Sequence, residues 1–127
     1  MKSVLRNKDT GNFLVRYIKS FINAINGIRY ALFYEHNMII IIAAIIVTTF
    51  AGFYFEISAY EWLFCVLIMG MVAATEMINT AIEAVVDLKT IENHPLAKIA
   101  KDTASSATLI LSVTAFIGAL IIFLPKM

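Results

Sequence analysis

The chain has one cysteine, Cys65, and only two histidines among its 127 residues. A single cysteine cannot form an internal disulfide, and a thiolate metal cluster needs several cysteines. The five glycines form neither the GxxxxGK[ST] motif nor the GxGxxG motif, which excludes a P-loop and a Rossmann turn as nucleotide sites. His36 and His94 have no nucleophile motif nearby, so Ser-His-Asp chemistry has little support.

Charged residues are also scarce, and their signs nearly balance. The formal net charge of +1 argues against a nucleic-acid partner, because such domains usually carry a strong basic excess. With 61% hydrophobic and 15% charged residues and a mean hydropathy of +0.84, the composition is that of a membrane protein. The N-terminus is polar and basic and does not have the pattern of a secretory signal peptide, so we expect the first apolar run to be retained.

Three apolar runs are long enough to cross a membrane core about 30 Å thick. They cover residues 38–55, 62–86 and 103–124, and residues 13–35 before them form an amphipathic pattern at helical spacing. We expect residues 1–127 to form a single all-α integral membrane domain, with the 13–35 helix lying on the membrane surface.

Lysine and arginine are distributed unevenly between the segments that connect these runs. Six precede the first run, none lies in 56–61, three lie in 88–102, and Lys126 alone follows the last run. By the positive-inside rule, the N-terminus and the 88–102 connection should face the cytoplasm of a multi-pass protein in the cytoplasmic membrane. The six cations before the first run are Lys2, Arg6, Lys8, Arg16, Lys19 and Arg29.

The second apolar run ends in a polar stripe. At about 100° per residue, four polar side chains fall within roughly 60° of Glu76 on one face of a helix. An ionisable residue inside a membrane span costs about 2.5–3.5 kcal/mol or more, so it normally faces a cavity or a partner and marks a functional site. A buried packing network is the structural alternative. The four side chains are Asn79, Thr80, Glu83 and Asp87.

The polar residues of several segments are expected to meet at one membrane interface. With a rise of about 1.5 Å per residue, Glu76 lies roughly 21 Å beyond Trp62, within the inner leaflet, and Glu83 lies roughly 31 Å beyond it, at the water. Glu35 belongs to the polar Glu35-His36-Asn37 break before the first run and reaches the same interface. The start of the third run adds Lys98, Lys101, Asp102, Thr103, Ser105 and Ser106.

This constellation favours phosphoryl transfer. Carboxylates without thiolates suit a hard, oxygen-ligated cation such as Mg²⁺, and magnesium together with a lysine indicates phosphate. Phosphoryl transfer needs metal clamps on the phosphates, positioning, and a carboxylate that accepts the proton of the attacking hydroxyl. A small proton-coupled transporter is the alternative, although transporter sites usually lie near the membrane midplane. A structural subunit of a larger complex would leave the acidic stripe unexplained.

Two stretches resemble the signature of the prokaryotic diacylglycerol kinase family: EMINTAIEAVVD at 76–87 and AKIAKD at 97–102. Gly27-Ile28-Arg29 and Glu35 fall where the family has its surface-helix motif and its first acidic residue. The resemblance implies an ATP-dependent membrane lipid kinase that assembles as a homotrimer, with sites built between neighbouring subunits. Some members phosphorylate diacylglycerol and others undecaprenol or related polyprenols, and NHPLAK at 93–98 looks more like the polyprenol branch.

The same resemblance implies roles for individual residues. Glu76 corresponds to the catalytic base that accepts the proton of the lipid hydroxyl, while Glu35 and Glu83 correspond to the Mg²⁺-binding pair that also holds ATP. Ser105 would lie near the lipid. Asn23 stands where some members carry a nucleotide-contacting tyrosine. Further contacts in the nucleotide site are implied for Arg16, Asn79, Asp87, Glu92, Asn93, His94, Lys101 and Asp102.

Overall fold

The computed structural model describes residues 12–127, and in this range the chain is helical without any strand. The expectation of an all-α fold is confirmed, and α2, α3 and α4 are each long and apolar enough to cross a membrane. Lys2, Arg6 and Lys8 lie outside the described residues. The elements are α1 (Phe13–Tyr34), α2 (His36–Tyr54), α3 (Ala59–Lys89), α4 (Pro95–Phe123) and a short 3-10 helix, η1 (Leu124–Lys126).

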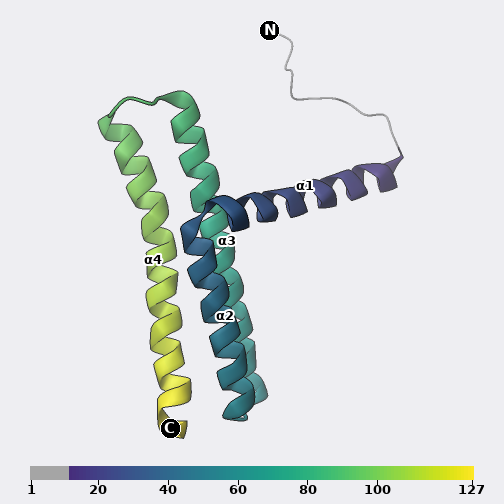
Figure 1. The fold of residues 1–127 in the computed structure, drawn as a ribbon, viewed down its shortest axis with the longest axis vertical. Coiled ribbons are helices and arrows are strands. Elements are labelled where there is room, and N and C mark those ends of the chain that lie inside the picture. Colours follow the sequence, from purple (N-terminus) through teal and green to yellow (C-terminus); the bar gives the residue numbers. More distant parts are fainter. Residues whose placement is uncertain (1–11) are drawn as a thin grey trace.

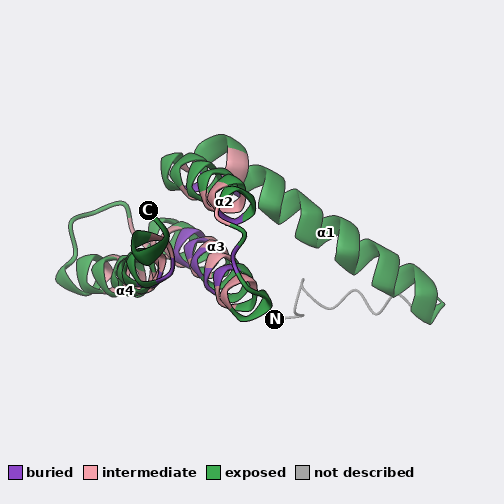
Figure 2. Cartoon of the chain, turned by 90° about the horizontal axis from the view of Figure 1, so that it is seen from below, coloured by how far each residue is buried: buried purple, intermediate pink, exposed green. Residues whose placement is uncertain are grey.

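Helix α3 is central to the arrangement. Seen along the long helices, α3 lies between α2 and α4, and the buried residues gather on it (Figure 2). Helix α4 packs along α3 more extensively than α2 does. Helix α1 leaves the three long helices crosswise, close to the start of α2 (Figure 1). Only Ala31 of α1 is fully buried, so α1 presents most of its apolar side chains to the surroundings.

Local signals explain where the helices begin. Ser58 and Glu61 form a capping box at the start of α3: Glu61 N donates to Ser58 Oγ at 3.3 Å, and Ser58 N donates to Glu61 Oε2 at 2.7 Å. At the start of α4, Pro95 occupies the first turn, and His94 Nδ1 accepts a hydrogen bond from Leu96 N at 3.2 Å. Glu35 has extended backbone angles, φ −104° and ψ 114°, and therefore separates α1 from α2.

The connection between the second and third apolar helices is shorter in the structure than the 88–102 segment that the sequence predicts. Helix α3 continues to Lys89, and α4 begins at Pro95 instead of at the apolar run 103–124. Hydropathy marks the segment that suits hydrocarbon, whereas caps and proline decide where a helix begins. The first turns of α4 are therefore polar and helical, and only residues 90–94 connect the two helices.

Residues 52–65 and 118–126, here called the aromatic end, hold the helices together at one end of the bundle. Ile57, Cys65 and Ile122 form a buried apolar cluster there, and Cys65 is a free thiol, as its lone occurrence requires. Two glycines permit close packing, because a Cβ on Gly52 would lie 2.6 Å from Trp62 Cη2, and a Cβ on Gly118 would lie 2.2 Å from Phe64 Cε1. The helix backbones therefore contact aromatic rings directly.

Candidate active site

The other end of the bundle, here called the carboxylate end, comprises residues 35–37 and 76–105. Burial decreases along α3 towards the connection 90–94: Glu76 is 1% exposed and Asn79 5% exposed, whereas Glu83 is half-buried and Asp87 is exposed. Glu76 is the largest fully buried side chain among the described residues. The predicted stripe therefore extends from the interior to the surface of the chain.

Glu76 lines a pocket of about 250 Å³ between α2, α3 and α4. Asn37 Nδ2, at the start of α2, donates a hydrogen bond to Glu76 Oε1 at 2.9 Å. Ser105 of α4 lines the same pocket, so the structure brings together the expected base and the residue expected near the lipid. Thr108 also lines the pocket, and its Oγ1 is buried without a hydrogen-bond partner among the described residues.

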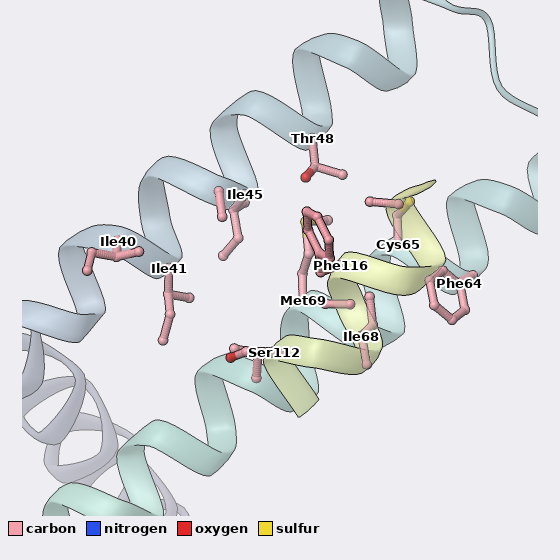
Figure 3. A pocket seen from close by; sticks show the side chains of 14 residues that line it. Ile40, Ile41, Ile45, Thr48, Phe64, Cys65, Ile68, Met69, Ser112 and Phe116 are labelled. Carbon is pink, nitrogen blue, oxygen red and sulfur yellow. The ribbon is translucent and has the colours of Figure 1, made fainter. Parts of the chain in front are cut away.

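An apolar cavity of about 330 Å³ adjoins this pocket (Figure 3). The two hollows share Ile40, Ile41 and Ser112 in their linings. On α3 the cavity is lined from Val72 to Phe64, roughly 12 Å by the helical rise. A buried carboxylate beside an apolar cavity suits a molecule that carries a hydroxyl at the end of a hydrocarbon chain.

Asn79 and Glu83 lie one turn apart on the same face of α3. Asn79 Nδ2 donates to Glu83 Oε1 at 3.2 Å, and Asn79 Oδ1 is buried without a partner among the described residues. No group of three or more His, Cys, Asp or Glu side chains in residues 12–127 is arranged to hold a metal. Mg²⁺ commonly binds one or two carboxylates and completes its shell with water and phosphate oxygens. The donor set around Glu83 is therefore compatible with magnesium bound together with a phosphate ligand.

A third hollow, of about 700 Å³, lies between the end of α3 and the start of α4, and we call it the loop cleft. Lys101 Nζ pairs with Asp87 Oδ1 at 2.5 Å, and Lys98 Nζ pairs with Asp102 Oδ2 at 2.5 Å. Lys101 and Asp102, which the sequence presents as one pair, therefore bind different partners. The loop cleft brings together Asp87, Glu92, Asn93, His94, Lys101 and Asp102, all predicted members of the nucleotide site.

Glu35, Asn79 and Glu83 are predicted nucleotide contacts that do not line the loop cleft. Arg16 and Asn23 do not line it either. Both are exposed on α1, and Arg16 lines a separate surface hollow with Phe13, Tyr17 and Ser20. The N-terminal half of α1 points away from α3 and α4 (Figure 1). Within one chain, Arg16 and Asn23 therefore lie apart from the other predicted site residues.

Three polar residues of the Glu76 pocket were not predicted as site residues: Asn37, Thr108 and Ser112. The spacing of Ser105, Thr108 and Ser112, three and then four residues, places them on one helix face and could have indicated the latter two. Asn37 had a weaker signal, since it belongs to the polar break before the first apolar run but lies 39 residues from Glu76 in the sequence.

Comparisons with known proteins show similarity to lipid kinases. An undecaprenol kinase of Bacillus subtilis is 42% identical over 121 residues, which cover 95% of this chain and 98% of that protein. A diacylglycerol kinase of Synechocystis sp. is 33% identical over 109 residues, 85% of this chain and 62% of that protein. A diacylglycerol kinase of Helicobacter pylori strain J99 is 50% identical over 50 residues, 39% of each chain.

The family model of prokaryotic diacylglycerol kinase matches residues 22–123, a range that contains α2, α3, α4 and most of α1. This range includes Glu76 and the residues that line its pocket. The chain therefore belongs to the prokaryotic diacylglycerol kinase family and is a phosphotransferase whose acceptor is a lipid alcohol.

Proposed function

We propose that the enzyme transfers the γ-phosphate of Mg-ATP to the primary hydroxyl of a membrane lipid alcohol, with Glu76 as the general base. The observation that carries this proposal is the position of Glu76: its carboxylate is 1% exposed and lines a pocket that adjoins an apolar cavity. A hydrocarbon tail in that cavity would present its terminal hydroxyl to the carboxylate. Ser105 lines the same pocket and would lie near the hydroxyl of the substrate.

In the proposed transfer of the γ-phosphate, the lipid oxygen forms a bond to the γ-phosphorus while its proton passes to Glu76. The bond between the γ-phosphorus and the bridging oxygen of ADP breaks. ADP leaves with the electrons of that bond. Proton transfer to a positioned carboxylate typically contributes about 10²–10⁴-fold to the rate of such a reaction.

We assign the nucleotide to the loop cleft and the magnesium ion to Glu35 and Glu83. The cleft has the volume of a small-molecule site, about 700 Å³, and Lys101 offers a cation for phosphate. Asn79 Oδ1, which has no hydrogen-bond partner in the described part of the chain, adds an oxygen one turn from Glu83 on α3. The remaining nucleotide contacts are proposed for Arg16, Asn23, Asp87, Glu92, Asn93, His94 and Asp102. When bound, the metal neutralises charge on the transferring phosphate.

The proposed assembly is a homotrimer in the cytoplasmic membrane, with α1 lying along the membrane surface and the carboxylate end facing the cytoplasm. The absence of Lys and Arg from residues 56–61 supports this orientation, because positive residues accumulate on the cytoplasmic side. The crosswise direction of α1 supports a surface position (Figure 1). Arg16 lies away from the loop cleft of its own chain, so its proposed nucleotide contact is compatible with a site shared between subunits.

Undecaprenol is the lipid alcohol that we propose, and diacylglycerol is the alternative. The support is the 42% identity to an undecaprenol kinase along nearly the whole of both chains. Radiolabelled ATP should therefore label undecaprenol faster than diacylglycerol in proteoliposomes of the same composition. Equal or faster labelling of diacylglycerol would reverse the assignment, and the absence of any lipid product would contradict the proposed reaction.

A small proton-coupled transporter is not favoured. The chain belongs to a lipid kinase family, and its polar stripe continues from Glu76 to Asp87, near the C-terminal end of α3, whereas transporter sites usually lie near the membrane midplane.

A further inference from the structure

The most buried carboxylate of the described chain has an amide as its side-chain partner. Asn37 Nδ2 donates to Glu76 Oε1 at 2.9 Å, across the contact between α2 and α3. Asn37 is exposed, whereas Glu76 is 1% exposed. This contact joins the first turn of α2 to the first residue of the polar stripe on α3.

A buried carboxylate needs such a donor. Removing a charged group from water without a hydrogen bond is costly, and a hydrogen bond to a charged group contributes about 1.5–3 kcal/mol. The last side-chain torsion of glutamate has a broad, roughly two-fold distribution, so packing alone leaves the carboxylate plane loosely defined. A bond from Asn37 to one oxygen limits this rotation and leaves the second oxygen available to an incoming hydroxyl.

The chemical type of the donor matters as much as its position. A lysine or arginine at this place would form an ion pair, as Lys101 does with Asp87, and would favour the unprotonated carboxylate. A neutral amide orients the carboxylate without adding a positive charge. A base must accept a proton during the reaction, so an uncharged donor suits Glu76 better than a cation.

We propose that Asn37 is a positioning residue for the general base: its amide holds Glu76 Oε1 and thereby directs Oε2 towards the lipid hydroxyl. The proposal rests on the proposed function, because it requires Glu76 to accept a proton. Asn37 acts through Glu76, and its contribution belongs to the chemical step and not to the binding of ATP or lipid.

Two substitutions of Asn37 separate this role from a structural one. Leucine has a similar size but offers no donor. Aspartate keeps the shape of asparagine but replaces the donor with a carboxylate, which places two like charges side by side, so that one of the two carboxylates must take up a proton. A residue that only fills space or satisfies a polar surface should tolerate aspartate better than leucine. A residue that positions a base should tolerate leucine better than aspartate.

The experiment measures kcat and both KM values in proteoliposomes for the parent, N37L, N37D and E76Q. A matched control is T49V, because Thr49 lies on the same helix and its hydroxyl bonds only to Ile45 O, at 2.7 Å. We expect N37L to lower kcat about 10- to 100-fold, the equivalent of one charged hydrogen bond, and N37D to lower kcat further. Both KM values should stay within about twofold of the parent, and T49V should match the parent.

The proposal is overturned if N37L and N37D both keep kcat within about twofold of the parent, or if N37D is the more active of the two. A raised KM with unchanged kcat also overturns it, because Asn37 would then bind a substrate. If N37L does not assemble, N37D alone decides, since its shape matches the parent. Failure of the proposed function has a different signature: E76Q would then retain activity, whatever the Asn37 variants do.

Discussion

The two ends of the helical bundle differ in their main contacts between helices. At the aromatic end, the rings of Trp62 and Phe64 lie against the backbones of Gly52 and Gly118, and a capping box closes the start of α3. One ion pair, between Lys126 Nζ and Glu61 Oε1 at 3.3 Å, accompanies this apolar packing. At the carboxylate end, the contacts between helices include a hydrogen bond from Asn37 to Glu76 and an ion pair between Lys101 and Asp87.

This difference indicates a division between stability and chemistry. Close apolar packing is intolerant of added volume, whereas exposed ion pairs contribute little to stability because water screens them. Asn79 Oδ1 at the carboxylate end and Thr108 Oγ1 in the Glu76 pocket are buried without a hydrogen-bond partner among the described residues, which leaves both oxygen atoms available to a ligand. Substitutions at the carboxylate end should therefore change activity, and substitutions at the aromatic end should change stability.

The largest effect is expected for Glu76→Gln. The amide can still accept the hydrogen bond from Asn37 through its oxygen, so the pocket and the assembly should be preserved. It cannot accept a proton from the substrate, and kcat should fall about 10²–10⁴-fold. Transfer of radiolabel from ATP to lipid measures this loss, with Glu56→Gln in the connection between α2 and α3 as the control. Turnover within tenfold of the parent would rule out Glu76 as the base.

The next effect concerns the metal. Glu35→Ala and Glu83→Ala should each raise the Mg²⁺ concentration needed for half-maximal activity, because each removes one proposed oxygen ligand. Removing a residue that only hydrogen-bonds to a metal ligand typically lowers metal affinity about 10- to 100-fold. Removing a ligand itself should lower the affinity by at least that factor. Titrating Mg²⁺ at fixed ATP measures the shift. A Glu35→Ala titration that overlays the parent would restrict Glu35 to a structural role at the break between α1 and α2.

The sequence predicted the membrane helices and the polar stripe because both depend on local patterns. Runs of apolar residues indicate α2, α3 and α4, and the 3.6-residue period places Glu76, Asn79 and Glu83 on one face. It did not predict that α4 begins at Pro95, because the first turns of that helix are polar. Hydropathy alone therefore located the spans but not the ends of the helices.

The partners of the site residues could not be predicted, because they depend on how distant helices pack. Asn37 and Glu76 are 39 residues apart, and no local spacing brings them together. Lys101 is next to Asp102 in the sequence but pairs with Asp87, because successive residues on a helix point in different directions. Arg16 and Asn23 were assigned by resemblance, and within one chain α1 carries them away from the loop cleft.

The aromatic end can be tested with glycine substitutions. Gly118→Ala would place a Cβ 2.2 Å from Phe64 Cε1, so the ring or the helix must move. Overpacking of this kind typically costs about 1–3 kcal/mol of stability, which thermal unfolding in detergent can measure. Gly70→Ala is a matched control within α3, because a Cβ there meets nothing within 4 Å.

The same series sharpens the comparison between the two ends. A second substitution, Phe64→Leu, replaces the ring with a smaller side chain and should restore part of the stability lost in Gly118→Ala. Below the unfolding temperature, Gly118→Ala should retain the KM for ATP, because Gly118 does not line the loop cleft. Equal unfolding temperatures for Gly118→Ala and Gly70→Ala would show that the close contact with Phe64 is not a determinant of stability.

The smallest effect is expected for Lys101→Ala. Lys101 and Asp87 are both partly exposed, with side chains 37% and 60% accessible, so loss of their ion pair should leave the unfolding temperature nearly unchanged. The KM for ATP should rise several-fold, because the loop cleft loses the cation that we propose for phosphate binding, while kcat should change little. Lys89→Ala is the matched control, since it removes the same charge from the end of α3 without lining the cleft. An equal rise in the KM for ATP in both variants would show that Lys101 acts only by long-range attraction of an anion. A fall in the unfolding temperature of Lys101→Ala without a change in KM would show that the pair of Lys101 with Asp87 is a structural contact between α3 and α4.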